Sequence, residues 1–383
     1  MDYRLDELFD LQMGKTPSRN NPDYWDSNDH KWISISDLSK CGKYISDTKE
    51  YLSDKAVADS GISQIPANTV IMSFKLSIGK TAITAEPMYS NEAIMSFRDL
   101  HKIDLLPDYI YYLLCSRDWD AGTNKAVMGK TLNKATLSQI KVKVHSYSEQ
   151  KEIVQVLDKI NSIIESRKSE LQSLDDLIKA RFVEMFGDTI LNPFGWSKAL
   201  LGSICDVRDG THDSPQYYET GFPLVTSKNV TGGKIDLTDC SLICEEDYNK
   251  INERSNVDKG DIIMPMIGTV GKPVIVDIEP RFAIKNVSLI KFKKASKVLN
   301  IYIRTLLQSD YFDDAVLSKI RGGTQKFISL GDIRKLEILV PPIELQSQFA
   351  TFVAQVDKSK FAVQKALDEA QLLFDSLMQK YFG

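Results

Sequence analysis

Two glycine-containing loops carry basic and amide side chains of the kind that contact nucleic acids. The candidate residues are Lys130, Thr131 and Asn133 in the first loop, and Arg321, Gly323, Gln325 and Lys326 in the second. Lysine and arginine neutralise phosphates, asparagine and glutamine hydrogen-bond base edges, and glycine lets the backbone approach a partner closely. Both surrounding segments, 117–143 and 315–335, have a local charge of +4. The alternative is an ordinary solvated loop, but recurrence in both halves of the chain favours a binding surface.

Other polar residues are weaker candidates for the same contacts. The loop near the N-terminus and its counterpart in the second half contribute Lys15, Ser18, Arg19, Asn20, His212 and Asp213. A second loop, which differs between the two halves, contributes Lys228 and Asn229. Lys80 and Lys272 each follow the glycine of a turn that occurs in both halves. Because the framework repeats while the polar side chains change, we expect two modules that read different features of one partner.

No arrangement of residues that would support catalysis is found in the sequence. The string Asn-Pro-Phe at 192–194 resembles a loop of adenine methyltransferases, but it lacks the second proline and no glycine-rich cofactor turn accompanies it. The string Gly-Lys-Thr at 79–81 ends like a phosphate-binding loop, yet Phe74 replaces the first glycine of that motif. None of the four histidines lies two to five residues from another histidine or a cysteine. We therefore expect no catalytic residue, no metal and no cofactor in this chain.

Length and composition limit the class of protein. The chain has 383 residues, of which 43% are hydrophobic and 26% charged, as is typical of globular proteins with two or three domains. Its 48 basic and 52 acidic residues give a net charge of −4, and the acidic excess lies in segments 148–188 and 344–383. The apolar runs are too short to span a membrane, and no secretory signal is recognised. Five irregularly spaced cysteines indicate reduced thiols, so we expect a cytoplasmic protein.

The chain is a tandem repeat of one unit of about 190 residues. At a shift of 193, residues 109–116 match 302–309, and Leu137 falls on Leu330. At a shift of 196, the string Phe-Gly at 186–187 falls on the same string at 382–383. Short apolar runs separated by turn residues predict two α/β (α+β) globular domains, at 1–147 and 189–343. Each globule is followed by one long helix, at 148–188 and at 344–383.

Apolar residues at heptad spacing in both helical segments predict that the two helices pair with each other. At 1.5 Å per residue each helix would extend roughly 58 Å, which is longer than a single globule of this size covers. We expect an antiparallel coiled coil with a globule at each end, a pseudo-twofold dumbbell, in which Arg167, Arg181 and Lys360 fix the register or pair with acids. The alternative is that each helix only caps its own globule. The expected seam consists of Ile153, Leu157, Ile160, Ile164, Leu171, Leu174, Ile178, Phe349, Val353, Val356, Val363, Leu367, Phe374 and Leu377.

The order of these parts, together with several recurring strings, resembles the DNA-specificity subunit of type I restriction-modification systems over essentially the whole length. The strings are Gly-Lys-Thr-Pro-Ser at 14–18, Pro-Leu-Val-Thr-Ser-Lys-Asn-Val at 223–230, Gly-Asp-Ile-Ile-Met at 260–264, Gly-Gly-Thr-Gln-Lys at 322–326 and Val-Pro-Pro-Ile-Glu-Leu-Gln at 340–346. The first unit departs from this pattern at 130–133, and at 146–150 it lacks the paired prolines.

The resemblance implies a non-catalytic subunit with two target-recognition domains, each of which reads one half of a bipartite DNA site. The helices would set the spacing between the half-sites and dock two methyltransferase subunits, which carry S-adenosylmethionine and flip out the target adenine. Restriction and translocase subunits would supply the ATP and Mg²⁺ chemistry. Two alternatives remain open: a coiled-coil scaffold for proteins without DNA specificity, and a degenerate DNA methyltransferase that acts alone.

Overall fold

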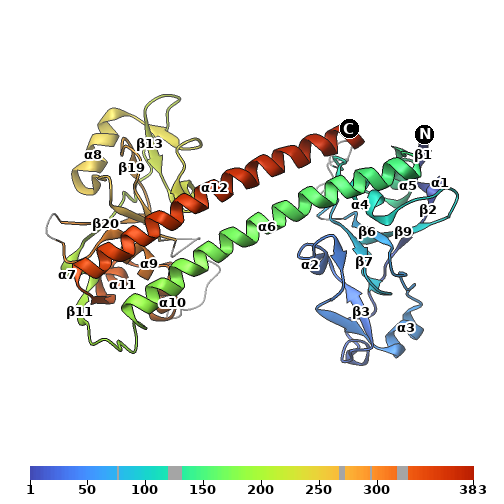
Figure 1. The fold of residues 1–383 in the computed structure, drawn as a ribbon, viewed down its shortest axis with the longest axis horizontal. Helices are drawn as coiled ribbons and strands as arrows, with labels where there is room; N and C mark the ends of the chain where they lie inside the picture. Colours follow the sequence, from blue (N-terminus) through green and yellow to red (C-terminus); the bar gives the residue numbers. More distant parts are fainter. Residues whose placement is uncertain (76, 120–131, 267–271, 294–295, 317–326) are drawn as a thin grey trace. The chain divides into compact units, whose positions relative to one another are not determined.

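The computed structural model describes residues 1–75, 77–119, 132–266, 272–293, 296–316 and 327–383. The chain forms two compact units (Figure 1). Unit 1 comprises Met1–Lys168 and Lys365–Gly383, and unit 2 comprises Ser169–Gln364. Each unit contains one globule and a part of each of two 40-residue helices, α6 (Tyr147–Phe186) and α12 (Ile343–Phe382). Among the described residues, none of the helices has the length and apolar character needed to cross a membrane.

Unit 1 is built around a five-stranded sheet with the order β2-β9-β6-β7-β4. These strands are β2 (Phe9–Met13), β9 (Ile94–Asp99), β6 (Val70–Ser73), β7 (Thr81–Thr84) and β4 (Tyr44–Ile45). A three-stranded sheet joins β5 (Glu50–Leu52), β3 (His30–Ile33) and β8 (Tyr89–Ser90), and a pair joins β1 (Asp2–Arg4) to β10 (Lys141–Lys143). The short helices are α1 (Leu5–Leu8), the 3-10 turn η1 (Pro22–Tyr24), α2 (Ile35–Leu38), α3 (Asp54–Ser60), α4 (Pro107–Cys115) and α5 (Lys134–Ser138).

Unit 2 repeats this plan. Its central sheet has the order β12-β20-β17-β18, from β12 (Asp206–Asp209), β20 (Val287–Lys291), β17 (Ile262–Pro265) and β18 (Val274–Ile275). The other strands are β16 (Ser241–Ile243), β13 (Phe222–Val225) and β19 (Ala283–Ile284) in one sheet, and the pairs β11 (Ser197–Leu200) with β21 (Glu337–Val340) and β14 (Val230–Thr231) with β15 (Lys234–Ile235). The short helices are α7 (Leu201–Ile204), η2 (Ser227–Asn229), α8 (Glu245–Ser255), α9 (Asn300–Leu306), α10 (Asp310–Ala315) and α11 (Leu330–Lys335).

Helices α4 and α9 anchor each central sheet to the long helices. α4 begins at Pro107, whose fixed φ suits the first turn of a helix, and Tyr109 on its inner face is fully buried. The Tyr109 hydroxyl donates to the carbonyl of Lys143 at 3.3 Å, and the Tyr302 hydroxyl of α9 donates to that of Leu339 at 3.0 Å. Burial raises the pKa of Tyr109 to about 12, so the hydroxyl stays protonated as a donor at neutral pH. The same bond therefore ties helix to strand in both units.

These paired tyrosine bonds show that the sequence-based register of the repeat was wrong in one place. Tyr109 and Tyr302 are 193 residues apart, whereas their acceptors Lys143 and Leu339 are 196 apart. Leu137 of α5 therefore corresponds to the equally buried Ile333 of α11, and not to Leu330. Unit 2 has three more residues than unit 1 between these two points, and the sequence match at a shift of 193 did not reveal them.

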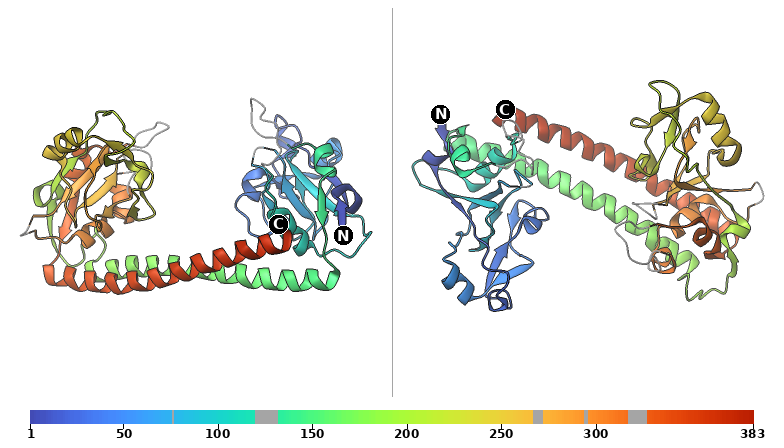
Figure 2. Two further views of the ribbon diagram at one scale, coloured as in Figure 1. Left: turned by 90° about the horizontal axis from the view of Figure 1, so that it is seen from above. Right: turned by 180° about the vertical axis from the view of Figure 1, so that it is seen from behind.

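The two long helices pair antiparallel, as predicted. In unit 1, Ile153 and Leu157 near the start of α6 share an apolar core with Phe374, Leu377 and Met378 near the end of α12. In unit 2 the opposite ends of the two helices lie side by side (Figure 2). There Ile178, Phe182 and Phe186 of α6 share an apolar core with Phe349, Val353 and Val356 of α12. The helix ends also pack on the globules. The alternative that each helix only caps its own globule therefore holds for a part of each helix.

The seam follows the predicted residues through most of both helices and then moves by one position. Ile153, Leu157, Ile160, Ile164, Ile178, Phe349, Val353, Val356 and Val363 are buried, while Leu171, Leu174, Leu367, Phe374 and Leu377 are half-buried. Heptad spacing continued to Arg181 and Met185, but the buried residues are Phe182 and Phe186. Phe182 stacks on Tyr302 with ring centroids 5.4 Å apart, and Phe186 packs edge-on against Phe349 at 5.4 Å. The aromatic core of unit 2 therefore selects the helix face there, in place of the strict seven-residue repeat.

Lys360 in the seam pairs with an acid, as the sequence predicted. Its ammonium lies 2.5 Å from Oδ1 of Asp175 on α6, inside unit 2. Because both side chains are partly exposed, we expect a coupling free energy of only about 0.2–1 kcal/mol between Lys360→Met and Asp175→Asn in urea unfolding. Strictly additive effects of the two substitutions would show that the pair contributes nothing. Arg304 of α9 also interacts with Asp175, so each single substitution changes more than the Lys360–Asp175 pair, and only the coupling free energy isolates that pair.

Candidate nucleic-acid interface

In unit 1, several loops leave the central sheet at the same end. The strand register pairs Met13 with Met95, Ser73 with Ile94 and Met72 with Thr81, so β2 and β6 end where β9 and β7 begin. Residues 132–133 join this end, because the Leu132 amide donates to the carbonyl of Phe74 at 3.1 Å. The end of β3 joins it through a bond from the Asn91 amide to the Ile33 carbonyl. We name these segments face 1: residues 14–20, 34–37, 74–75, 77–80, 90–93 and 132–133.

Unit 2 presents the same construction. Asp209 pairs with Ser288, Pro265 with Val287 and Ile263 with Val274, so the ends of β12 and β17 again meet the starts of β20 and β18. The Ile328 amide donates to the Met266 carbonyl at 2.9 Å, and the Lys285 amide donates to the Val225 carbonyl at 2.9 Å. The equivalent segments form face 2: residues 210–214, 226–229, 266, 272–273, 284–286 and 327–329.

A glycine permits the close packing of the first loop in each face. A Cβ on Gly14 would lie closer than 3.0 Å to the carbonyl oxygens of Ser90 and Asn91, and one on Gly210 would lie that close to the carbonyl of Ile284. Both glycine amides donate to the neighbouring strand connection, Gly14 to Ile94 at 3.2 Å and Gly210 to Val287 at 3.0 Å. The two positions are thus structurally equivalent, and each requires a residue without a side chain.

Face 1 gathers several of the candidate residues, and Arg19 is the most firmly held of them. The Arg19 guanidinium lies 3.7 Å from the centre of the Trp25 ring and 4.7 Å from that of Trp32, and it forms an ion pair with Glu50. The Lys15 ammonium donates to the Ser60 carbonyl at 2.5 Å. The carbonyl of Ser18 accepts from the Trp25 indole at 3.1 Å. Asn20 and Lys80 are exposed. Arg19 is therefore presented at the surface in one fixed orientation.

A carboxylate that the sequence did not single out also lies on face 1. The Thr16 hydroxyl donates to Glu92, and this bond, with smaller contributions from Lys75 and Arg19, lowers the pKa of Glu92. Glu92 is therefore ionised at neutral pH and offers an acceptor among basic side chains. No motif surrounds it in the sequence, and only the pairing of the strands brings it to the loop at 14–20.

Asn133 has a structural role at the edge of face 1. Its side-chain oxygen accepts from the Thr136 amide at 2.7 Å and so caps the first turn of α5, as Ser329 caps α11 in unit 2. The side chain remains exposed. The other main candidates, Lys130, Thr131, Arg321, Gly323, Gln325 and Lys326, lie outside the described residues.

A hydrogen-bonded charged cluster around Asp209, the last residue of β12, borders face 2 and includes His212 of that face. The carboxylate is nearly buried, and it lies 2.8 Å from Nε2 of His212 and forms an ion pair with Arg254. The other ring nitrogen of His212 lies 2.9 Å from the side-chain oxygen of Asn286. Asp213, which follows His212, is exposed. Arg254 at the end of α8 is 45 residues from Asp209 in the chain, so no local pattern could have indicated it.

Lys228 and Lys272 are exposed on face 2, but Asn229 is not. Asn229 is only 6% exposed, and its side-chain oxygen accepts from the amide and the hydroxyl of Thr226 at 3.0 Å each. Its NH₂ group donates to the Asp239 carbonyl at 3.3 Å. Asn229 thus shapes the turn, as Asp37 does with Ser34 in face 1. Asn229 therefore supports the loop that carries Lys228, and a contact of Asn229 with DNA stays a prediction.

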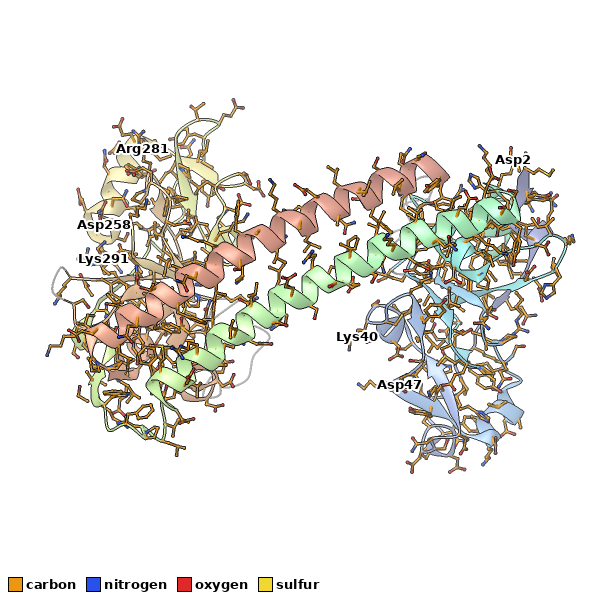
Figure 3. The ribbon with its side chains drawn as sticks, viewed as in Figure 1. Asp2, Lys40, Asp47, Asp258, Arg281 and Lys291 are labelled. Atoms are coloured by element: carbon orange, nitrogen blue, oxygen red, sulfur yellow. The ribbon has the colours of Figure 1, made fainter. Side chains whose placement is uncertain are left out.

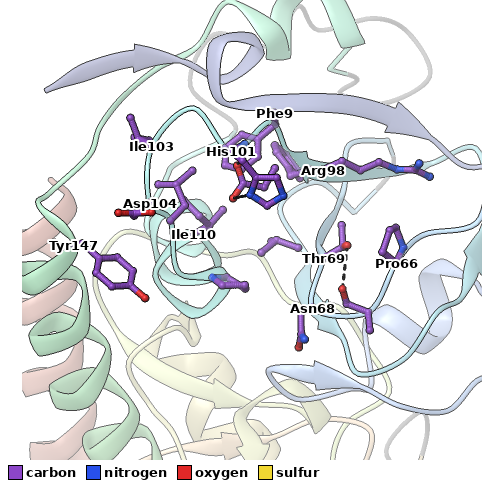
Figure 4. A pocket seen from close by; sticks show the side chains of 16 residues that line it. Phe9, Pro66, Asn68, Thr69, Arg98, His101, Ile103, Asp104, Ile110 and Tyr147 are labelled. Carbon is purple, nitrogen blue, oxygen red and sulfur yellow. Dashed lines mark hydrogen bonds and ion pairs between the residues drawn. The ribbon is translucent and has the colours of Figure 1, made fainter.

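A further hollow in unit 1 lies away from face 1. A pocket of about 450 Å³ lies at the other end of the unit 1 sheet, between Val70 and Asp99, and it includes His101, Asp104 and Tyr147 (Figure 4). In this pocket Nδ1 of His101 lies 3.3 Å from Oδ2 of Asp99, and neither a serine nor a cysteine lines it. Across the part of the chain that the structure describes, no three His, Cys, Asp or Glu side chains form a group that would hold a metal ion.

Comparison with known proteins gives consistent matches. A family model described as the type I restriction modification DNA specificity domain matches residues 1–175 and 193–370. The type I restriction enzyme MjaIX specificity subunit of Methanocaldococcus jannaschii is 24% identical over 412 residues, covering 98% of this chain and 91% of that protein. The EcoR124I/EcoR124II specificity subunit of Escherichia coli is 27% identical over 179 residues, covering 44% and 43%. A solved type I S subunit from M. genitalium is similar in fold, with a TM-score of 0.56, 16% identity and coverage of 100% and 96%.

Proposed function

Because the chain belongs to the family of type I restriction-modification DNA specificity proteins, we propose that its two units each read one half of a bipartite DNA site. The observation that carries this proposal is the repeat of one loop framework with different side chains on faces 1 and 2. Equivalent glycines, Gly14 and Gly210, open both faces. Two equivalent frameworks with unlike polar groups suit an asymmetric site with two unlike halves.

The side chains of the two faces suit different base edges. On face 1, the ionised Glu92 is an acceptor for an exocyclic amino group such as cytosine N4, and the exposed Lys80 suits a phosphate. Beside face 2, Arg254 is a donor that the Asp209 carboxylate orients, and it suits guanine O6 and N7 or a phosphate, whereas both ring nitrogens of His212 are engaged by Asp209 and Asn286. We therefore expect the two half-sites to differ in sequence.

We further propose that the long helices set the spacing of the half-sites and dock two methyltransferase subunits. Outside the seam, α6 exposes Val156 and Ile163 in unit 1, seven residues apart, and α12 exposes Phe361 in unit 2, where 75% of it is accessible. Docking of a protein partner on the helices would bury these side chains. S-adenosylmethionine, ATP and Mg²⁺ would belong to the methyltransferase and restriction subunits, and this chain would be the non-catalytic member of a cytoplasmic complex. The scaffold alternative lacks support from the family match.

Exchange of one recognition domain tests the assignment of one half-site to each unit. When residues 1–147 are replaced by those of another family member, we expect the methylated motif to change in one half only, because face 1 lies wholly within that segment. The measurement is a map of methylated adenines in cells that contain the chimaera and the methyltransferase subunit. A change in both halves, or in neither, would contradict the modular assignment.

A further inference from the structure

A buried glutamine joins the globule of unit 1 to the first turns of α6. Gln150 is only 1% exposed, and its side-chain oxygen accepts from the amide of Leu106, the residue before α4, at 3.0 Å. Its NH₂ group donates to the carbonyl of Asp104 at 3.0 Å and to that of His145 at 3.1 Å. One side chain on α6 therefore fixes the start of α4 and the segment that follows β10.

Unit 2 contains the same joint. Gln346 of α12 is fully buried, and its oxygen accepts from the amide of Leu299, the residue before α9, at 2.8 Å. Its NH₂ group donates to the carbonyls of Lys297 at 3.0 Å and Pro341 at 2.9 Å. The three partners are the structural counterparts of those in unit 1. Only the leucine has the same residue type in both units.

Another polar contact between the globule and α6 in unit 1 is not repeated in unit 2. In unit 1 the Lys43 ammonium lies 2.5 Å from Asp158 of α6, but at the structural counterpart of Asp158 in α12 the residue is Ala354. A contact that serves only local stability can differ between the units in this way. The glutamine contact is present in both units, and in each unit both polar atoms of the side-chain amide are hydrogen-bonded to the backbone. This repetition indicates a requirement common to both recognition domains.

We propose that Gln150 and Gln346 are positioning residues that fix the orientation of each face on the long helices, and so determine which spacer lengths between half-sites are accepted. This rests on the proposed function. One added base pair moves a half-site by about 3.4 Å and turns it by roughly 35° about the DNA axis. Discrimination against that shift requires a rigid connection between the globule and the long helix. Three hydrogen bonds from one buried side chain to the backbone provide this rigidity.

The test uses the complex of this chain with its methyltransferase subunit. Methylation rates are measured on duplexes that carry the native motif with its own spacer, and with one base pair more or fewer. For Gln150→Met, which removes all three bonds at similar volume, we expect the preference for the native spacer to fall about tenfold, equivalent to roughly 1.4 kcal/mol. The half-site bases that are methylated should not change, and Gln346→Met should have the same effect.

Controls separate positioning from loss of stability. Ile65→Ala removes buried apolar volume in a separate cluster of unit 1, and it should lower the melting temperature while the spacer preference stays native. If Gln150→Met does not fold, Gln346→Met serves, because it removes the three equivalent bonds in unit 2. A native spacer preference in a folded glutamine variant would overturn the proposal. Failure of the proposed function would look different, since the wild-type complex itself would then methylate no gapped motif.

Discussion

Methylation by the complex is expected to fall about 100-fold or more when Gly210 is replaced by alanine. The added Cβ would lie closer than 3.0 Å to backbone atoms of Ile284 and Lys285, so the loop that begins face 2 must move away from the β19–β20 connection. That movement breaks the bonds from the Gly210 amide to Val287 and from the Thr211 amide to Ile284. It also displaces His212, so about 3 kcal/mol of loop stability and the geometry of the face are lost together.

Matched glycine substitutions make this expectation specific. Gly14→Ala should have the same effect through face 1, because its Cβ would meet the carbonyls of Ser90 and Asn91. Gly42→Ala should leave methylation unchanged, since nothing lies within 4 Å of a Cβ at that position. Rates are compared at equal concentrations of folded complex, verified by circular dichroism. Normal methylation by Gly210→Ala would show that face 2 does not read DNA.

The second large effect is expected in the stability of unit 2, when Lys291 is replaced by methionine. The Asp261 carboxylate is only 4% exposed and lies 2.5 Å from the Lys291 ammonium, which also pairs with the exposed Asp258 at 2.7 Å (Figure 3). Removal of the ammonium leaves a buried carboxylate without its main partner, although the Asp258 amide still donates to it at 2.8 Å. We expect the free energy of unfolding to fall by about 3–5 kcal/mol.

The pH dependence of this loss follows from the direction of the pKa shift. Burial raises the pKa of Asp261 above its ordinary value, and the Lys291 ammonium opposes that rise, so the pKa is higher still in Lys291→Met. A raised pKa in the folded state favours folding below the unfolded-state pKa of about 3.9, and this advantage is lost as the pH rises through the folded-state pKa. The deficit of the variant should therefore be largest at neutral pH and should shrink as the pH falls.

Urea unfolding at several pH values measures this effect, and a double variant provides the control. Asp261→Asn keeps an acceptor for the Asp258 amide but carries no charge, so Asp261→Asn with Lys291→Met should recover most of the lost stability. If the double variant were as unstable as Lys291→Met alone, the buried charge would not be the cause. A deficit independent of pH would lead to the same conclusion.

Long-range regularity in the sequence predicted the large features of the fold. Heptad spacing and length predicted α6, α12 and their antiparallel pairing, because the burial of an apolar stripe depends on a period that can be counted. The drift of the seam to Phe182 and Phe186 was not predictable, since it depends on Tyr302, which is distant in the chain. The register error around Leu137 arose because the shift of 193 was continued past the three additional residues of unit 2.

The candidate site was predictable in part, for a related reason. Basic and polar loops could be named from residue type, but their gathering at one end of each sheet depends on the strand order, which periodicity does not reveal. Glu92 and Arg254 carry no local signal and are placed by strand pairing and by α8. Gln150 and Gln346 could have been found, because they fall on each other at the shift of 196 that already aligned the helix ends.

The measurement that tests the central claim most directly is a map of adenine methylation. This chain and the methyltransferase subunit of its system are expressed together in a host without adenine methylation, and modified bases are located by single-molecule sequencing. We predict a bipartite, gapped motif that is present with both proteins and absent when this chain is omitted. Absence of new methylation, with the two proteins shown to form a complex, would contradict the claim that the chain selects the DNA site.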